Sequence, residues 1–452
     1  MTKRTLLDEL AVDGSRVTAK ANPVFHERFL RDDLFVEYDR TVSLEGLDQS
    51  ILAIPFLLNV LPLVWLSGET YYIDRMDAQL AQALETIRAT FRKLHPDFAW
   101  DGALIAEQTV EPPRAIESDA RALLFTGGVD SMHAHLVHQG KPQVLFTILR
   151  ALGGGPDSAR HGRVNSATRK YVQAFANELG HRSSFATSNA VDFISTKKLV
   201  GTWPRPRRWL IELQYGLGFV GVAAPLVQQL GLAKLVMAGC ELDHYGLPSG
   251  SHPDIVNKVA WSGTTVCMEG LGQRRQHKVH ALLESLSAGH PGGVELKPCL
   301  FPSDEFENCC NCSKCLQTIL GILGDAGDPG EFGFSVEPQV AFRRLREQLD
   351  LQRLSLPDIG ELLQWMDIQS AIRQILTDPL SAQRWADKQA DGAEWFAKYD
   401  FVQYFARHHS RNRRALRSAR MQVGLYLDSW PALGRVLRRV LNPLLQPFLK
   451  WR

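Results

Sequence analysis

The chain has 452 residues, 45% of them hydrophobic and 22% charged, a composition typical of a globular protein with two or three domains. Its net charge of +2 is uneven, because residues 401–452 carry +10 and residues 1–400 carry −8. The longest apolar run, residues 51–66, contains two prolines and is shorter than the about 20 residues of a membrane span. Two acids precede any long apolar stretch at the N-terminus. We therefore expect a cytoplasmic protein without a secretory signal or transmembrane segment, with residues 51–66 in a buried core.

The first 115 residues are predicted to form an N-terminal accessory domain (residues 1–115). Short strands are predicted at Leu34–Tyr38 and Thr70–Ile73. A helix is predicted over Asp77–Leu94, where apolar residues recur every three or four positions. Pro112 and Pro113 then indicate a domain boundary, because paired prolines disfavour both helix and strand.

From Ala122 onward, predicted strands alternate with predicted helices. The strands are Leu123–Phe125, Val144–Ile148, Ser183–Ala186 and Lys234–Ala238, and the helices are Ser131–His138, Ser166–Leu179 and Leu210–Leu230. This alternation predicts an α/β fold, with a parallel sheet and helices on both faces. Ligands bind such sheets at the carboxyl ends of the strands.

Residues 123–131 read Leu-Leu-Phe-Thr-Gly-Gly-Val-Asp-Ser, an apolar strand that passes through two glycines into a helix. The first N–H groups of a helix have no intrahelical partner, and glycines let an anion approach the backbone closely. Asp130 can hold a cation or orient the loop, and the Ser131 hydroxyl can donate a hydrogen bond. The sequence thus predicts an anion site at Thr126, Gly127, Gly128, Val129, Asp130 and Ser131, with an ordinary strand-to-helix turn as the alternative. Both Asp130 and Ser131 are expected at the surface, where substitution leaves the fold intact.

A second loop follows the strand Lys234–Ala238. It runs from Gly239 to Pro248 and places two acids, Glu241 and Asp243, where a parallel sheet presents ligands.

Five of the seven cysteines lie between positions 299 and 315. Four thiolates suit tetrahedral Zn²⁺ in a closed structural site, and the binding energy of such a site is folding energy. We expect zinc to be bound by Cys299, Cys309, Cys312 and Cys315. An iron–sulfur cluster, or Cys310 in the place of Cys309, is the alternative.

The glycine loop resembles the Ser-Gly-Gly-x-Asp-Ser loop of the PP-loop ATP pyrophosphatases, with Thr126 in the place of the first serine. Within that superfamily, the 7-cyano-7-deazaguanine synthases carry a Glu-x-Asp-x-x-Gly-x-Pro loop after the corresponding strand and a four-cysteine zinc site near the C-terminus. Glu241, Asp243, Gly246 and Pro248 match that loop, and the three elements follow in the same order over about residues 120–320. The chain departs from the family at Ser249-Gly250-Ser251, where the synthases have Asp-Cys-Arg.

The resemblance implies a PP-loop ATP-binding domain over residues 116–325, with ATP and Mg²⁺ bound by residues 126–131 together with Glu241 and Asp243. Asp130 and Ser131 would take part in catalysis. The family activates a carboxylate or amide as an adenylate, releases pyrophosphate, and lets an amine displace AMP. The implied substrate is a small deazaguanine-like acid.

The sequence is also consistent with a different acceptor for the adenylate chemistry and with a function other than catalysis. Similar synthase-like proteins with extra domains occur in bacterial antiphage and nucleic-acid modification gene clusters, so a specialised paralogue is one expectation. The acceptor could instead be tRNA or a protein. The chain could also be a non-catalytic nucleotide-binding scaffold.

The C-terminal part divides into a helical extension, residues 326–400, and a basic tail, residues 401–452. The tail combines clustered arginines with apolar residues at helical spacing, Leu437 and Leu441 among them. It could bind a polyanion, such as RNA, DNA or an anionic membrane surface. It could equally fold onto the acidic body of the chain, which would cover the apolar stripe.

Overall fold

The computed structural model describes residues 4–111, 119–151, 158–239, 248–289, 294–354, 356, 358–377 and 390–409. Glu241, Asp243 and the basic tail beyond His409 lie outside the described residues. The chain forms two compact units. Unit 1 comprises Met1–Asp243, Pro248–Leu271 and Asp304–Phe306, and unit 2 comprises His244–Leu247, Gly272–Ser303 and Glu307–Arg452.

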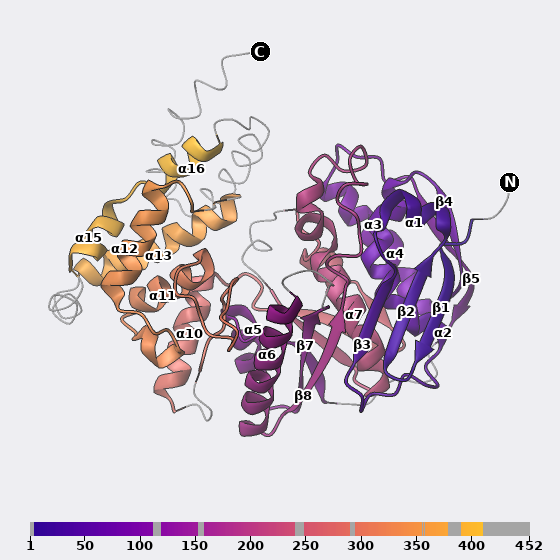
Figure 1. The fold of residues 1–452 in the computed structure, drawn as a ribbon, viewed down its shortest axis with the longest axis horizontal. Helices are drawn as coiled ribbons and strands as arrows, with labels where there is room; N and C mark the ends of the chain where they lie inside the picture. The colour runs from indigo at the N-terminus through magenta and orange to yellow at the C-terminus, as the bar shows by residue number, and fades with distance from the viewer. Residues whose placement is uncertain are drawn as a thin grey trace, which may run out of the picture. The chain divides into compact units, whose positions relative to one another are not determined.

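The described part of unit 1 is built on a nine-stranded sheet (Figure 1). Its strands are β1 (Leu7–Asp13), β2 (Arg16–Ala21), β3 (Leu34–Tyr38), β6 (Arg121–Leu124), β7 (Gln143–Arg150), β8 (Arg182–Ser188), β9 (Lys234–Ala238), β10 (Ala260–Trp261) and β11 (Thr264–Glu269). Their order across the sheet is β1-β2-β3-β8-β7-β6-β9-β11-β10. The five strands from β8 to β11 in this order are parallel, as the alternating pattern predicts. The outer strands on both sides are antiparallel, so the predicted parallel strands form the centre of a mixed sheet.

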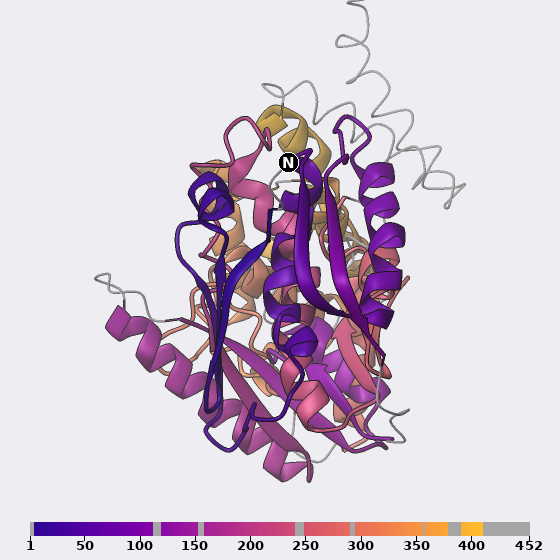
Figure 2. The same cartoon turned by 90° about the vertical axis from the view of Figure 1, so that its right-hand side faces the viewer.

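The N-terminal segment contributes directly to this sheet. Strands β1, β2 and β3 join it because β3 pairs with β8. A separate two-stranded parallel sheet is formed by β4 (Thr70–Asp77) and β5 (Ala103–Val110), with helix α4 (Ala78–Leu94) between them in sequence (Figure 2). The strands and the helix predicted in this segment are therefore confirmed, while the pairing of β3 with β8 links the predicted accessory segment to the central strands.

Helices cover both faces of the main sheet. The helical segments of unit 1 besides α4 are α1 (Pro23–Phe29), α2 (Gln49–Leu52), α3 (Ile54–Leu66), α5 (Val129–Val137), α6 (Ser158–Glu178), the 3₁₀ turn η1 (Pro206–Arg208), the π turn η2 (Leu210–Gln214), α7 (Tyr215–Gln229) and α9 (Pro253–Val256). Side chains of a strand alternate between its faces. On β6 and β7, Ala122, Val144 and Phe146 belong to the hydrophobic core that includes α3 and α7. On the opposite face, Phe125 stacks on Phe175 of α6 with ring centroids 5.3 Å apart.

The most apolar helices are core helices of unit 1. Every residue of α3 from Ile54 to Trp65 is buried, which confirms the prediction for this run. By length and composition alone, the segment Leu210–Gln229 could cross a membrane. However, 78% of its most apolar stretch is buried inside the protein, as in a core helix. The sequence predicts one regular helix here, whereas its first turn is π-helical. In this turn the Ile211 carbonyl accepts a hydrogen bond from the Gly250 N–H (3.1 Å), so the segment around Gly250 lies alongside the turn.

Unit 2 is helical in its described part, as the sequence predicts after the cysteine cluster (Figure 1). Its helical segments are α10 (Arg275–Ser287), α11 (Ser313–Gly324), the 3₁₀ turn η3 (Pro329–Phe332), α12 (Pro338–Asp350), α13 (Ile359–Thr377), α15 (Ala390–Lys398) and α16 (Phe401–His409). Helix α16 belongs to the predicted basic tail. Its Phe401 stacks on Trp365 of α13 (5.7 Å), and its Tyr404 hydroxyl donates to the Leu354 carbonyl (2.9 Å). Phe401, Val402, Tyr404 and Phe405 at the start of that tail are therefore buried in unit 2.

Candidate functional site

The strand order identifies one point on the sheet edge where ligands bind in folds of this kind. If β6, β7, β8, β9 and β11 are numbered 1 to 5 in chain order, their order across the sheet is 3-2-1-4-5. The chain thus proceeds in one direction from β6 to β8 and then continues on the other side of β6 with β9. In open α/β sheets, the crevice at such a reversal, beyond the carboxyl ends of the two strands, is the usual ligand site. Residues 125–131 follow β6 at that position, and Gly239 follows β9.

The glycine loop leads directly into helix α5. Gly128 is the N-cap residue and provides no side-chain cap, and Asp130 lies in the first turn. Thr126 is exposed and Asp130 is half-buried. The N-terminus of α5 therefore presents backbone N–H groups and the positive end of the helix dipole beside an acid that can hold a cation.

Ser131 ties the loop together from inside. Its hydroxyl donates to the Gly128 carbonyl (3.1 Å), and its Oγ lies 3.3 Å from the Thr126 N–H. The side chain is only 5% exposed, so the expectation that Ser131 lies at the surface is wrong. The reason is that a hydroxyl in the first helical turn reaches back to the Gly128 carbonyl, which also accepts from the Met132 N–H (2.9 Å). In this conformation Ser131 positions the loop.

Two further residues fix the loop, and the sequence motif does not include them. Tyr171 of α6 packs against Gly127, whose φ of +75° suits glycine. A Cβ at Gly127 would lie 2.6 Å from Cε1 of the Tyr171 ring. Thr147 of β7 donates from its hydroxyl to the Phe125 carbonyl (2.7 Å), which holds the end of β6. Neither residue belongs to a recognisable motif, because both act across strands and helices distant in sequence.

The other end of α5 is anchored by a three-residue polar bridge. Arg121 Nη1 lies 2.7 Å from His138 Nδ1, and His138 Nε2 lies 2.9 Å from Glu269 Oε1. Because a guanidinium only donates, Nδ1 is the acceptor and Nε2 carries the hydrogen that it donates to Glu269. Burial lowers the pKa of His138, which agrees with this neutral ring. The backbone carbonyl of Glu269 also accepts from the Gly239 N–H (2.7 Å), so the same bridge holds the start of the loop that contains Glu241 and Asp243.

The segment after that loop, Ser249-Gly250-Ser251, is built into the π turn before α7. Besides the bond from Gly250 to Ile211, the Leu217 N–H donates to the Gly250 carbonyl (3.1 Å). A Cβ at Gly250 would lie 2.6 Å from the carbonyl carbon of Leu213, so only glycine fits there. Gly250 thus has a packing role in this segment.

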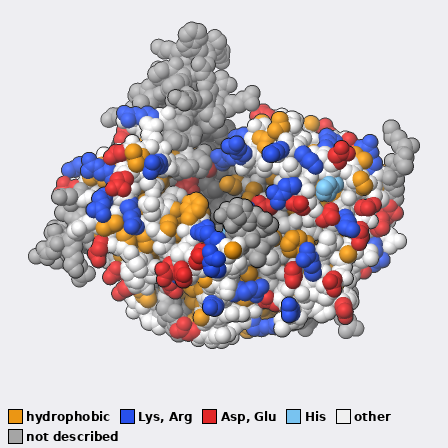
Figure 3. All heavy atoms as spheres, viewed as in Figure 1, with side chains coloured by type: hydrophobic (Ala, Val, Ile, Leu, Met, Phe, Trp, Pro, Cys, Tyr) orange, Lys and Arg blue, Asp and Glu red, His pale blue; other side chains and the backbone are white. Residues whose placement is uncertain are grey.

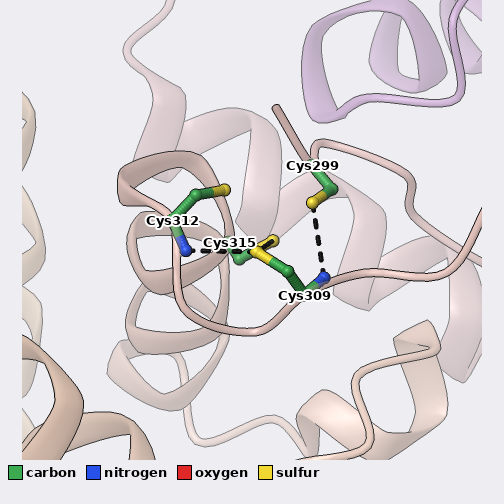
Figure 4. A group of neighbouring side chains, drawn as sticks. All are labelled: Cys299, Cys309, Cys312 and Cys315. Atoms are coloured by element: carbon green, nitrogen blue, oxygen red, sulfur yellow. Dashed lines mark hydrogen bonds between the residues drawn. The ribbon is translucent and has the colours of Figure 1, made fainter. Parts of the chain in front are cut away.

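The cysteine cluster lies in unit 2, in the loop before α11 and the first turn of that helix (Figure 4). The Sγ atoms of Cys299, Cys309, Cys312 and Cys315 all lie within 4.8 Å of one another. Cys309 and Cys315 have their sulfurs 3.9 Å apart, close to the about 3.8 Å that separates ligands in a tetrahedron with metal–sulfur bonds of about 2.3 Å. The sequence prediction that these four thiols come together is confirmed. The cluster can hold a metal ion.

Backbone N–H groups support the sulfurs as they do for thiolates. The N–H groups of Phe301 and Cys309 both donate to Cys299 Sγ at 3.3 Å. That of Cys312 donates to Cys309 Sγ at 3.2 Å, and Figure 4 draws the two bonds between cysteines. Cys312 is also the N-cap residue of α11, where the helix dipole favours negative charge. The loop therefore stabilises sulfur in its metal-binding form.

Cys310 is not part of the cluster. It has a φ of +49°, and its Sγ donates to the Asn308 carbonyl at 3.5 Å. This left-handed residue turns its side chain away from the four sulfurs, so Cys309 and not Cys310 is the cluster member. Spacing alone left both possible.

Hydrogen bonds among Cys299, Cys312 and Cys315 shift the pKa values of these three thiols in opposite directions. A hydrogen bond with the Cys299 thiol, followed by one with Cys315, lowers the pKa of Cys312. The bond with Cys312 raises the pKa of Cys299 to about 12, and that with Cys299 raises the pKa of Cys315. One thiolate thus forms readily while its neighbours keep their protons. A divalent cation supplies the charge that lets all four lose them.

Comparisons with models of known protein families and with curated proteins find no match to this chain. The functional interpretation consequently depends on the site geometry and on the motifs that form it.

Proposed function

We propose that the protein is an ATP-dependent ligase of the PP-loop type, similar to the 7-cyano-7-deazaguanine synthases. The observation that carries the proposal is the position of residues 126–131 at the reversal of the 3-2-1-4-5 strand order, at the N-terminus of α5. A loop of this sequence at this position is what phosphate binding requires. The four-cysteine cluster, the second element shared with those synthases, adds independent support.

In this proposal the loop binds the phosphates of ATP. The backbone N–H groups at the start of α5 stabilise the negative charge that develops on pyrophosphate as it leaves. Asp130, with Glu241 and Asp243 from the second loop, holds Mg²⁺, since carboxylates are the protein ligands that this cation prefers. Magnesium neutralises phosphate charge. Ser131 and Tyr171 keep the loop in its conformation.

The reaction begins when a carboxylate oxygen of the substrate attacks the α-phosphorus of ATP. The bond from that phosphorus to the bridging oxygen breaks, and pyrophosphate leaves with the electron pair. Ammonia or another amine attacks the resulting acyl-adenylate, loses a proton and displaces AMP, which gives an amide. When the amide oxygen is adenylated by a second ATP, loss of AMP and protons gives a nitrile. For the synthase family, the starting acid is 7-carboxy-7-deazaguanine.

The metal of unit 2 is proposed to be zinc in a structural role. Four thiolates close the coordination sphere and leave no position for a substrate. Reduced thiols in such a site suit a reducing compartment, so we also propose a cytoplasmic location.

A macromolecular acceptor is the second candidate. It is favoured by Ser249-Gly250-Ser251, which lacks the charged side chains that the synthases carry at these positions. In this version the same adenylation acts on a tRNA or a protein.

The two versions are separated by a direct assay. The purified full-length protein is incubated with ATP, Mg²⁺, ammonium and 7-carboxy-7-deazaguanine, and AMP and pyrophosphate are measured. Stoichiometric AMP and pyrophosphate with the small acid alone supports the synthase version. Release that begins only when RNA or a protein is added supports a macromolecular acceptor. ATP binding without any AMP under all conditions would contradict a ligase and indicate a nucleotide-binding scaffold.

A further inference from the structure

A groove of about 730 Å³ lies beside the cysteine cluster, wholly within unit 2. One wall is the cysteine loop, from Leu300 and Phe301 to Ser313, and the other is the second half of α12 with the turn after it. The proposed adenylation site in unit 1 does not use these residues. A metal site with only a structural role does not require an open groove beside it.

The apolar part of the groove carries an exposed aromatic ring. Phe301 is 66% exposed, and Leu300 and Leu351, which also line the groove, are 54% and 58% exposed. Phe301 is held in place because its N–H donates to Cys299 Sγ (3.3 Å). This bond anchors the backbone of Phe301 beside the cysteine cluster, and its exposed flat ring at the groove is a surface on which a nucleobase can stack.

The polar part contains two cations. Arg344 is fixed by the hydrogen bond from its Nη1 to the Cys310 carbonyl (2.8 Å), and Arg353 lines the groove beyond it. Over the face drawn in Figure 3, basic and acidic side chains are interspersed without a field of one sign. Within the groove, this local pair of arginines attracts a phosphate, because planar guanidinium groups match phosphate geometry.

Among the described residues that line the groove, Glu347 is the acid. A carboxylate repels phosphate, but it accepts hydrogen bonds from the amino group of a base such as cytosine. Gln348, whose Nε2 donates to Asn311, connects the two walls next to it. The groove thus contains a stacking ring, two phosphate-binding cations and an acceptor for a base amino group.

We propose that this groove binds a short single-stranded stretch of nucleic acid, with one base stacked on Phe301 and a flanking phosphate at Arg344 and Arg353. The basic tail of the same chain is a poor occupant of the groove, because its arginines would be repelled by Arg344 and Arg353. A peptide would use the leucines, but it would leave the arginine pair and the acid without a common ligand. Binding here is independent of the proposed ligase activity, because no ATP is involved.

The test uses the full-length, metal-loaded protein and two fluorescein-labelled 12-nucleotide RNAs, one all cytidine and one all uridine. Fluorescence anisotropy without ATP gives the dissociation constants. The wild type is expected to bind the cytidine RNA more tightly than the uridine RNA. Phe301→Ala should weaken both by about tenfold or more, because stacking on an aromatic ring is lost, while Phe301→Tyr keeps the affinity. Glu347→Ala should remove the difference between the two RNAs.

Charge is tested by a matched pair of arginines. Arg353→Ala should weaken binding and reduce the salt dependence, because one phosphate contact is lost. Arg343, exposed on α12 but outside the groove lining, is the control, and Arg343→Ala should bind as the wild type does. Each variant is checked for metal content and thermal unfolding, so that a folding defect is recognised.

Several results would overturn the assignment. One is wild-type affinity in both Phe301→Ala and Arg353→Ala, which would place all RNA binding elsewhere in the chain. Another is the absence of RNA binding by the wild type at low salt. Loss of a co-purifying protein in Phe301→Ala, with RNA binding unchanged, would assign the groove to a protein partner instead. None of these results depends on AMP formation, so the proposed ligase activity stands or fails separately.

Discussion

Gly127 and Tyr171 are packed so closely that a Cβ at Gly127 would lie 2.6 Å from Cε1 and 2.8 Å from the hydroxyl oxygen of the tyrosine. Glycine is thus required by its φ of +75° and by the space that the ring leaves. The contact joins the loop after β6 to helix α6. It determines the conformation of the segment that we propose binds the phosphates of ATP.

Gly127→Ala is therefore expected to impair both folding and activity. A left-handed conformation costs a residue with a side chain about 1–2 kcal/mol, and the ring must also move. We expect unfolding at lower denaturant concentration and AMP formation reduced at least about tenfold, as a displaced loop loses transition-state stabilisation. Gly140→Ala is the control, since a Cβ there meets nothing within 4 Å. Equal activity in the two variants would contradict the role of this loop.

Asp130→Ala and Ser131→Ala are both expected to lose AMP production, but they should differ in their free energy of unfolding. Ser131→Ala removes the hydroxyl that donates to Gly128 and should lower the free energy of unfolding by about 1 kcal/mol. Asp130→Ala should lower it by less than Ser131→Ala does, because Asp130 is half-buried whereas Ser131 is only 5% exposed. AMP production and chemical denaturation of the two variants provide the check. Full AMP production by Asp130→Ala would rule out this loop as the nucleotide site.

Metal content distinguishes Cys310 from Cys309 and Cys312. Cys312→Ser should lose the metal and become less soluble, because the loop before α11 loses its folding energy. Cys310→Ser should keep about one zinc per chain, since the Cys310 sulfur bonds to Asn308 and not to the cluster. Elemental analysis of the purified variants decides the matter. Iron together with visible absorption in the wild type would show that the metal is not zinc.

Stability should fall between pH 7 and pH 5, partly because of His95. Its burial, mainly, lowers its pKa from 6.5 to about 4. The folded ring stays neutral while the unfolded one binds a proton, so its stabilising contribution is present above pH 6.5 and is lost as the pH falls toward 4. Between pH 7 and pH 5, His95 should lower the free energy of unfolding by about 2 kcal/mol. His95→Phe, which retains an aromatic ring against Trp203, should reduce the pH dependence. An unchanged slope of stability against pH in His95→Phe would exclude His95 as a cause.

Local signals account for what could be predicted from the sequence. The alternation after Ala122 predicts the central strands and helices, and the spacing of four cysteines predicts their cluster. The antiparallel pairing of β3 with β8 joins residues about 150 positions apart, and no local pattern specifies such a partner.

The details of the site depend on similar long-range contacts. The π turn before α7 forms where Gly250 lies against it, and nothing in residues 210–214 indicates this. The burial of Ser131 follows from the direction of one hydroxyl toward Gly128, which a motif of residue types does not encode. The choice of Cys309 over Cys310 follows from a left-handed φ at Cys310, an effect of the folded loop.

Adenylation of the substrate is the central claim, and oxygen transfer tests it most directly. The purified protein is given ATP, Mg²⁺, ammonium and 7-carboxy-7-deazaguanine labelled with ¹⁸O in its carboxylate, and the AMP is examined by mass spectrometry. Attack of the carboxylate on the α-phosphorus predicts AMP that carries one ¹⁸O from the acid, formed with an equal amount of pyrophosphate and absent in Asp130→Ala. Unlabelled AMP, or ADP and phosphate as the products, would contradict the account.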